Sequence, residues 1–402
     1  MGGLPVRPLV RKNRQAAPAL GAPLQPFRGG PRPKSGYEGN PLEALMEAIE
    51  ISGTGMVGSR IGLGTWAIGG WMWGGTDEVD SIRTIHAALD QGVTLLDTAP
   101  VYGFGRSEEI VGKAIAARGE RERVLLATKV GLEWWNGEVY RNTAPERIRM
   151  ELEDSLRRLR TSYIDIYQVH WPDPLVPLEE IAAVLRQLFE QGKIRAIGVS
   201  NFSPEQMATF GTVAPIHVTQ PPYNLFERQI EADVLPYAER HGLTVLAYGA
   251  LCRGLLSGRI RAETTFTGDD LRKVDPKFTP PRLPQYLKAV AALDDLARRR
   301  YGKNVLALAV RWVLDQGPTI ALWGARSPGQ LAPLREVVGW HLDDDTRRDI
   351  DRILAETITD PVGPEFMAPP VRETAARARR GRSIAPAKAE RRIVATANGP
   401  GP

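Results

Sequence analysis

The chain has 402 residues with a single cysteine, Cys252, and five histidines, so an intrachain disulfide and a multi-cysteine metal site are excluded. The histidines show no H-x-H or H-E-x-x-H spacing, and we predict no metal centre. The net charge of +5 comes from the two ends: residues 1–45 carry seven basic and two acidic side chains, and residues 372–402 carry eight and two. This leaves residues 46–371 with a net charge of −6, which argues against binding to nucleic acid.

The basic ends are rich in Pro, Gly, Ala and Arg and poor in the apolar residues that build a core. We predict that residues 1–45 and 372–402 are disordered extensions of one folded domain, residues 46–371. The sequence has no stretch near the ~20 apolar residues of a membrane span and no apolar run typical of a signal peptide. We therefore expect a cytoplasmic protein, a monomer or weak oligomer, that binds neither nucleic acid nor membrane.

The first predicted element is a short β-hairpin within residues 46–60. Amphipathic helical patterns such as 145–160 and 178–191 follow it and alternate with runs rich in Val, Ile and Leu. Eight such strand–helix units over about 260 residues favour a closed (β/α)8 barrel of the α/β class, a TIM barrel, with the hairpin at the barrel floor. The predicted strands are 61–67, 93–99, 124–130, 164–170, 194–200, 217–220, 243–249 and 319–325.

Two segments do not fit the simple alternation of strands and helices: the glycine motif at 62–67 and the long irregular connection at 252–284. Residues 62–67, GLGTWA, match the dinucleotide fingerprint G-x-G-x-x-G/A, but no helical pattern follows them, so we predict no Rossmann domain. Residues 252–284, between the seventh and eighth strands, form a longer connection than usual. Such long connections are often functional, and we expect this one to be so.

Four ionisable side chains lie at or just after the C-terminal ends of predicted strands two, three and four: Asp97, Tyr102, Lys129 and His170. These strand ends meet at one mouth of a barrel, where active sites lie, so we predict that the four converge. Lys129 stands in an apolar strand and needs a carboxylate partner, which Asp97 supplies. We expect the ammonium to lower the pKa of Tyr102 from ~10, making the phenol a general acid, and His170 to polarise a carbonyl oxygen.

This set of four resembles the catalytic tetrad of the aldo-keto reductases, and the resemblance covers roughly Met46 to Pro370. The motifs GTWAIGGWMWGG, DTAPVYGFGRSEEIVGKA, ALWGARSPGQL and DPVGPEFMAPP are most similar to the bacterial general-stress-protein branch. The resemblance implies NADPH-dependent reduction of aldehydes or ketones to alcohols, with Tyr102 as the proton donor, and a role in the stress response. It also leaves an alternative, a cofactor-sensing accessory subunit similar to the channel β subunits of the same superfamily.

The same resemblance implies how the cofactor is held. Ser200, Asn201 and Gln220 would bind the nicotinamide carboxamide, Tyr248 would stack on the ring, and Arg326 would contact the adenosine 2′-phosphate. The chain departs from many relatives at Pro333-Leu334, where they carry a Glu-Asn pair against adenine. The full set implied for the cofactor is Thr65, Trp66, Asp97, Ser200, Asn201, Gln220, Tyr248, Leu251, Arg253, Gly254, Gly324, Arg326 and Gln330.

Several tryptophans follow predicted strand ends at the same mouth. An aromatic lining of this kind suits apolar or aromatic aldehydes and ketones. The predicted substrate pocket consists of Trp66, Trp71, Trp134, Trp135 and Trp171.

Overall fold

The computed structural model describes residues 46–372. The ends predicted to be disordered, 1–45 and 372–402, lie outside these residues except for Arg372. Within the described part, eight parallel strands close into a barrel in which β12 pairs with β3 and β9 pairs with β10. Each strand lies within one of the eight predicted runs, so the predicted (β/α)8 barrel is confirmed. The barrel strands are β3 (Ile61–Gly64), β4 (Leu95–Asp97), β5 (Leu125–Val130), β8 (Ile166–Val169), β9 (Ile197–Ser200), β10 (Val218–Gln220), β11 (Thr244–Ala247) and β12 (Thr319–Gly324).

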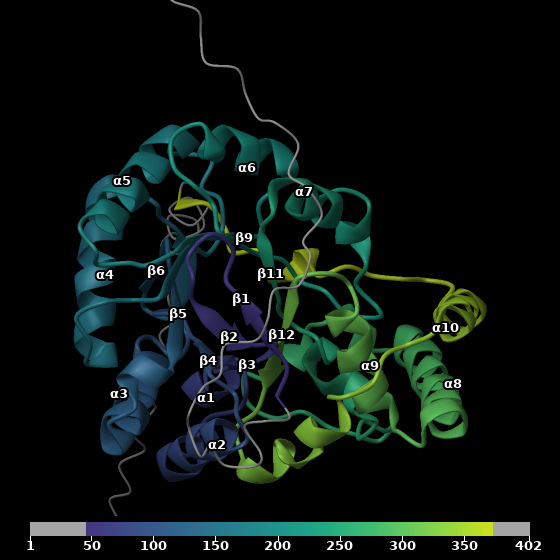
Figure 1. Cartoon of the computed structure of the whole chain (residues 1–402). Helices are drawn as coiled ribbons and strands as arrows, with labels where there is room; N and C mark the ends of the chain where they lie inside the picture. The colour runs from purple at the N-terminus through teal and green to yellow at the C-terminus, as the bar shows by residue number, and fades with distance from the viewer. Residues whose placement is uncertain (1–45, 373–402) are drawn as a thin grey trace, which may run out of the picture. The chain divides into compact units, whose positions relative to one another are not determined.

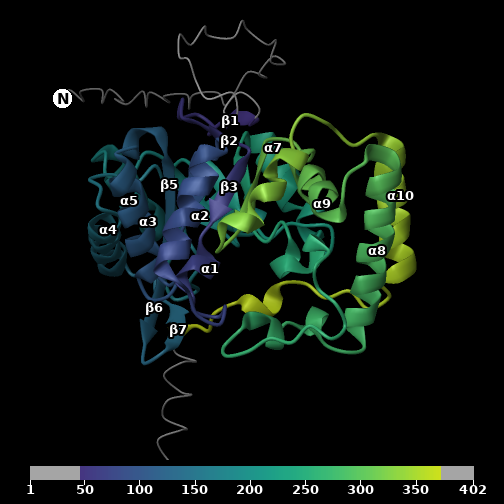
Figure 2. The same cartoon turned by 90° about the horizontal axis from the view of Figure 1, so that it is seen from below.

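Helices surround the barrel (Figure 1). The predicted helices 145–160 and 178–191 are present as α4 and α5, and α10 packs against α8 at one edge (Figure 2). Of the helices in residues 46–372, none has both the length and the apolar character that crossing a membrane requires. The helices are α1 (Trp66–Gly69), α2 (Glu78–Asp90), α3 (Arg106–Arg118), α4 (Pro145–Leu159), α5 (Leu178–Glu190), α6 (Pro204–Gly211), α7 (Val234–His241), α8 (Arg282–Tyr301), α9 (Val305–Leu314) and α10 (Asp344–Thr357).

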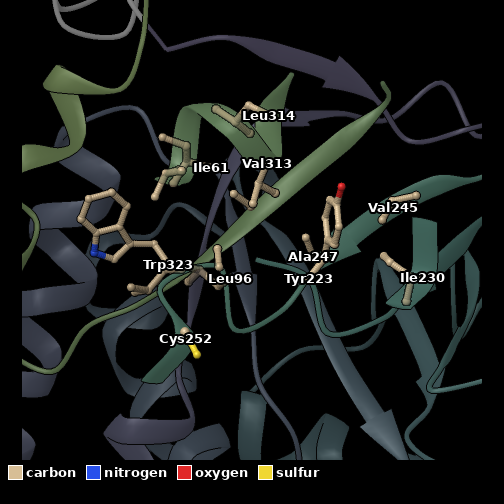
Figure 3. Close-up of a cluster of buried hydrophobic side chains, with 14 of the residues drawn as sticks. Ile61, Leu96, Tyr223, Ile230, Val245, Ala247, Cys252, Val313, Leu314 and Trp323 are labelled. Carbon is tan, nitrogen blue, oxygen red and sulfur yellow. The ribbon is translucent and has the colours of Figure 1, made fainter. Parts of the chain in front are cut away.

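The outward side chains of the barrel strands form the layer between strands and helices. Successive residues of a strand point to opposite faces, so every second residue of β3, β11 and β12 faces this layer. Figure 3 shows part of it, in which Ile61, Val245 and Trp323 of these strands belong to one buried cluster with Val313 and Leu314 of α9. This apolar layer holds the strands against the surrounding helices, as β12 against α9 and β5 against α4.

The inward side chains at the N-terminal ends of the strands form a second apolar cluster, which includes Leu95, Leu246 and Ile320. A hairpin of β1 (Ala48–Glu50) and β2 (Val57–Ser59) contributes Ile51 and Met56 of its turn to the same cluster. The hairpin therefore covers the barrel floor, as predicted. Figure 2 shows it at the end of the barrel opposite β6 and β7.

At the other end, a second hairpin joins β6 (Leu132–Trp135) to β7 (Glu138–Arg141). Its two-residue turn, Asn136-Gly137, has positive φ at both positions (49° and 78°), which a tight hairpin turn of the favoured hand requires. The chain beyond α10 passes along this same end (Figure 2). The long connection between β11 and β12 contributes three short 3-10 segments, η4 (Cys252–Ser257), η5 (Leu271–Lys273) and η6 (Pro276–Phe278).

Candidate active site

Polar side chains replace apolar ones at the C-terminal ends of the barrel strands. Asp97, Lys129, Gln168, Ser200 and Gln220 each stand two residues beyond an inward-facing apolar or glycine position, so strand alternation turns them into the barrel mouth. The register sets Lys129 opposite Gln168 and Gln220 opposite Ser200. All five are buried, so each needs a polar partner.

Lys129 and Asp97 satisfy each other inside this layer. The Lys129 Nζ lies 2.9 Å from Oδ1 and 2.5 Å from Oδ2 of Asp97, and it also donates to the Thr98 carbonyl at 3.0 Å. Asp97 accepts a further hydrogen bond from Gln220 Nε2 at 2.8 Å. The ammonium and carboxylate are 1% and 3% exposed, so the pair is a buried, mutually neutralised ion pair.

Tyr102 reaches this pair from the loop between β4 and α3. Its hydroxyl oxygen accepts a hydrogen bond from Lys129 Nζ at 3.3 Å, and Trp66 stacks on its ring at 5.8 Å with an interplanar angle of 19°. The loop packs closely against α1, because a Cβ atom at Gly103 would lie 2.1 Å from the Gly69 carbonyl oxygen. Glycine at 103, which also has a φ of 67°, therefore keeps the tyrosine at this position.

The prediction that Lys129 lowers the pKa of Tyr102 is wrong. Burial raises the pKa of Tyr102 well above its usual value, and the negative charge of Asp97 raises it further. The reason is that Asp97 already neutralises the ammonium, so the pair offers little net positive charge to a phenolate. The hydroxyl therefore stays protonated at neutral pH, which is the state that a proton donor requires.

His170 follows β8 and faces Tyr102. The two ring centroids are 5.8 Å apart and nearly perpendicular, at 83°. Burial lowers the pKa of His170 well below its ordinary value, and the charge of Lys129 lowers it further. The imidazole is therefore neutral near pH 7 and carries one N–H. The backbone carbonyl of His170 accepts a hydrogen bond from Asn201 Nδ2 at 2.9 Å.

Two adjoining cavities open around these residues. The first, about 210 Å³, contains Arg326 in its lining and is called the Arg326 cavity. The second, about 320 Å³, contains His170 and is called the His170 cavity. Both cavities are lined by Trp66, Tyr102, Tyr248 and Met367. The two cavities therefore meet at these residues, Tyr102 among them.

All of the residues implied for the cofactor line one or both cavities. Ser200, Asn201 and Gln220 lie in the His170 cavity, and Trp66 and Tyr248 lie in both. The remaining members line the Arg326 cavity: Thr65, Asp97, Leu251, Arg253, Gly254, Gly324, Arg326 and Gln330.

The predicted substrate tryptophans divide into two groups. Trp66, Trp71 and Trp171 line the His170 cavity. Trp134 and Trp135 do not belong to its lining. Trp134 packs against Phe104 at 5.7 Å, and Trp135, on the other face of β6, is 68% exposed.

Two further side chains, Arg253 and Leu334, are held by contacts within the protein. The Arg253 guanidinium is buried between Glu227 and Asp275, with Nε 2.5 Å from Asp275 Oδ2, so its charge is already neutralised. Leu334, at the position where relatives carry an adenine contact, is buried in the core. Neither side chain is free to bind a ligand in this arrangement.

Three residues that the motifs did not indicate also belong to the site. Gln168 accepts from Gln220 Nε2 at 3.1 Å inside the polar layer. Trp73 and Arg272 line the Arg326 cavity. The signals for them were a polar residue at an inward position of the IDIYQVH strand, the Trp- and Gly-rich run 70–75, and the long connection 252–284.

The Arg326 cavity suits a dinucleotide. Arg326 is exposed and donates from Nη1 to the Trp73 carbonyl at 2.6 Å, while its backbone N–H donates to Gln330 Oε1 at 2.8 Å. Buried indole N–H groups of Trp66 and Trp73 have no hydrogen-bond partner among residues 46–372. A Cβ atom at Gly324 would meet nothing within 4 Å, so the wall leaves room there. Phosphate and ribose oxygens are suitable acceptors for these donors.

Comparison with known proteins finds aldo-keto reductases by sequence and by structure. A sequence profile of the Aldo/keto reductase family matches residues 60–355. The chain is 64% identical over 329 residues to Aldo-keto reductase YhdN of Bacillus subtilis (strain 168), which covers 82% of this chain and 99% of that protein. The structure of the glycerol dehydrogenase AKR11B4 from Gluconobacter oxydans matches with a TM-score of 0.73 and 57% identity, over 80% of this chain and 99% of that one. An aldo-keto reductase from Klebsiella pneumoniae in complex with NADPH matches with a TM-score of 0.61 and 29% identity, over 77% and 95%.

Proposed function

This chain belongs to the aldo/keto reductase family of oxidoreductases, and on that premise we propose that it uses NADPH to reduce aldehydes or ketones, with Tyr102 as the proton donor. The observation that carries the proposal is the position of the Tyr102 hydroxyl. It lies where the two cavities meet, 3.3 Å from Lys129 Nζ. A carbonyl oxygen in the His170 cavity would reach this hydroxyl. The nicotinamide of the cofactor would lie beside it, against Ser200, Asn201 and Gln220, and the rest of the cofactor would extend into the adjoining Arg326 cavity.

Tyr102 gives its proton to the carbonyl oxygen, and Lys129 stabilises the phenolate that this transfer leaves. The raised pKa of the buried phenol keeps the proton in place until a substrate oxygen begins to gain negative charge. Once the proton has left, the Lys129 ammonium donates a hydrogen bond to the phenolate. Asp97 holds the ammonium in position through both carboxylate oxygens.

His170 orients the same carbonyl oxygen. A neutral imidazole donates one hydrogen bond, which fixes the oxygen near Tyr102 without adding a competing acidic proton. Its neutrality follows from the burial and the neighbouring Lys129 charge that lower its pKa. The rest of the cavity is mostly apolar, with Trp66, Trp71 and Trp171 among its walls. We infer that it accepts apolar or aromatic carbonyl compounds.

NADPH, when bound, supplies the hydride that the carbonyl carbon receives. The residues that would hold its nicotinamide are Ser200, Asn201, Gln220 and Tyr248. The Asn201 amide is fixed on both sides, because Nδ2 donates to the His170 carbonyl and Oδ1 accepts from the Tyr248 hydroxyl at 2.9 Å. This leaves the Tyr248 ring as a fixed flat surface between the two cavities.

Arg326 carries the choice of NADPH over NADH. A guanidinium binds a phosphate through charge-assisted hydrogen bonds, whereas NADH has only hydroxyl groups at the corresponding ribose. The hydrogen bond from Arg326 to the Trp73 carbonyl holds the guanidinium at the cavity wall. The cytoplasmic location, the role in the stress response and the monomeric or weakly oligomeric state stay predictions.

The experiment that tests the function is Tyr102→Phe, assayed with NADPH and a panel of aldehydes and ketones. We expect kcat to fall about 10²–10⁴-fold and the Kd for NADPH to stay near that of the wild type. Tyr163→Phe, which removes a phenol outside both cavities, is the matched control. Retention of most of the kcat in Tyr102→Phe would remove Tyr102 from its role. Wild-type turnover far below about one per minute on every carbonyl tested, against the ~1 s⁻¹ or more typical of enzymes, would favour the cofactor-sensing alternative.

A further inference from the structure

We propose that Arg272, supported by Trp73, is a second phosphate-binding cation of the Arg326 cavity, and that it contacts the pyrophosphate common to NADPH and NADH. This inference rests on the proposed use of a nicotinamide dinucleotide. It adds to the proposed function a contact that strengthens binding without selecting between the two cofactors.

The charges around the Arg326 cavity leave few cations for a ligand. Three arginines line it: Arg253, Arg272 and Arg326. Arg253 is neutralised by two buried carboxylates, and Arg326 makes no ion pair among residues 46–372. A dinucleotide phosphate brings several negative charges, so one cation alone would leave most of them unpaired. Arg272 is the third cation of this lining, and it pairs with a single carboxylate, that of Asp270, where Arg253 pairs with two.

Arg272 is held with one nitrogen directed at a defined place. Its Nε and Nη2 donate to Asp270 at 2.9 and 2.6 Å, which leaves Nη1 outside this two-bond pair. A Cβ atom built on Gly254 would lie 3.9 Å from Nη1. The free edge of the guanidinium therefore faces the turn Leu251–Gly254, the segment that the family resemblance assigns to the pyrophosphate.

Two aromatic rings hold the guanidinium between them. The Arg272 Cζ lies 4.2 Å from the centroid of Phe266 and 5.4 Å from that of Trp73. A guanidinium fixed by two rings and a carboxylate has lost most of its side-chain freedom before a ligand binds. Such preorganisation lowers the entropic cost of forming a new contact. This separates Arg272 from an ordinary surface arginine.

Trp73 provides a second donor on the same wall. Its buried Nε1 has no partner within the described residues, and its ring meets Trp66 edge to face at 5.7 Å. The loop that carries Trp73 is tied to the loop of Arg272, because Asp269 accepts from the backbone N–H groups of Met72 and Gly74 at 2.7 and 3.0 Å. The two donors therefore keep a fixed separation.

The location of Arg272 predicts which phosphate it contacts. Arg326 lies beside Gln330, at the position assigned to the 2′-phosphate, whereas Arg272 faces the turn that ends at Gly254. Both cofactors contain the pyrophosphate, but only NADPH contains the 2′-phosphate. Loss of Arg272 should therefore weaken both cofactors equally, and loss of Arg326 should weaken NADPH alone.

The test is a fluorescence titration of the full chain with NADPH and with NADH, in the absence of substrate. We expect Arg272→Gln to raise both dissociation constants about 10- to 100-fold, as for one charge-assisted hydrogen bond, and to leave their ratio unchanged. Lys273→Gln is the matched control, because Lys273 is an exposed cation at the next position that does not line the cavity. We expect it to change either constant less than about twofold, since exposed charges are largely screened.

A double variant separates lost attraction from new repulsion. Arg272→Gln leaves the Asp270 carboxylate unpaired beside the phosphates, so Asp270→Asn/Arg272→Gln should retain at least about a 10-fold weakening of both cofactors. Wild-type affinity in the double variant would overturn the proposal. So would a loss confined to NADPH, or an equal loss in Lys273→Gln.

Trp73→Phe keeps an aromatic ring beside Arg272 and removes the indole N–H together with the five-membered ring that carries it. We expect both dissociation constants to rise about 3- to 10-fold, with an unchanged circular dichroism spectrum. If Arg272→Gln does not fold, unchanged constants in Trp73→Phe overturn the proposal. A wild-type chain that binds neither dinucleotide would instead overturn the proposed function, so the two failures are distinguishable.

Discussion

Replacing Lys129 by methionine removes the positive half of the buried ion pair at the barrel mouth. Methionine is similar in length to lysine and fills most of the same volume, so the main loss is electrostatic. Asp97 loses its contacts with Nζ at 2.9 and 2.5 Å, and the Thr98 carbonyl loses its donor at 3.0 Å. Asp97 keeps only the hydrogen bonds to Oδ1 from Gln220 Nε2 at 2.8 Å and from Gln168 Nε2 at 3.5 Å.

The cost follows from leaving a carboxylate unpaired at a site where the side chain is 3% exposed. Breaking a buried pair in this way destabilises a protein by about 3–5 kcal/mol. The entropy of unfolding of a domain of about 330 residues is roughly 0.7 kcal/mol/K. The melting temperature should therefore fall by about 4–7 °C. The kcat should fall at least about 100-fold as well, because the Tyr102 phenolate loses its hydrogen-bond donor.

Calorimetry and urea unfolding of Lys129→Met measure the first effect, and a steady-state assay measures the second. The double variant Asp97→Asn/Lys129→Met tests the cause, because it removes both charges. It should recover much of the lost stability while staying inactive. A melting temperature of Lys129→Met within 1 °C of the wild type, or a double variant less stable than the single one, would refute the buried-pair reasoning.

Three other predictions concern the cofactor, the domain limits and a buried acid. Arg326→Ala should raise the Kd for NADPH about 10- to 150-fold and make it less salt-dependent, with little change for NADH; equal losses in a fluorescence titration would mean that Arg326 shapes its loop instead. Residues 46–372, which include the Arg372–Asp173 ion pair at 3.4 Å, should fold alone, keep the full kcat and have an acidic isoelectric point; a kcat below half that of the full chain would contradict this. Burial raises the pKa of Glu151 to about 7, so its contribution to stability is present below the unfolded value near 4.5 and is lost as the pH rises through 7. Glu151→Gln should therefore gain up to about 3 kcal/mol relative to the wild type between pH 5 and pH 7.5, and urea unfolding that shows a pH-independent difference would indicate an ordinary carboxylate.

The barrel could be predicted because its strands are short apolar runs of similar length, separated by helical periodicity. The predicted runs extend past the observed strands at several C-terminal ends, as for 61–67 against Ile61–Gly64. Residues just after the last strand–strand hydrogen bond still fit the strand pattern in the sequence, although in the structure they lie at the mouth of the barrel. Asp97 and Lys129 could be placed at this mouth for the same reason, since strand alternation alone sets their direction.

The loops around the mouth could be predicted only in part. The β6–β7 hairpin was absent from the predicted elements, although Asn136-Gly137 between two apolar runs is a strong hairpin signal. Trp134 and Trp135 were assigned to the pocket from their distance along the chain to a strand end. On the hairpin Trp134 packs in one cluster with Trp71 and Trp171 without lining the His170 cavity, and Trp135 is exposed. Arg272 and Trp73 meet through contacts between loops nearly 200 residues apart in sequence, and no local pattern encodes such a contact. The error on the pKa of Tyr102 arose because the burial of the phenol, which raises its pKa most, and the added effect of the Asp97 charge were not considered.

The wall that the two cavities share also limits how the enzyme can be redesigned or can diverge. Met367 lines both cavities, so a mutation there that admits a larger substrate also changes the surface offered to the cofactor. Leu132 and Val139, on the β6–β7 hairpin, line the His170 cavity alone. Substitutions at these two positions should therefore change the substrate range more than the nucleotide affinity, because neither residue lines the Arg326 cavity.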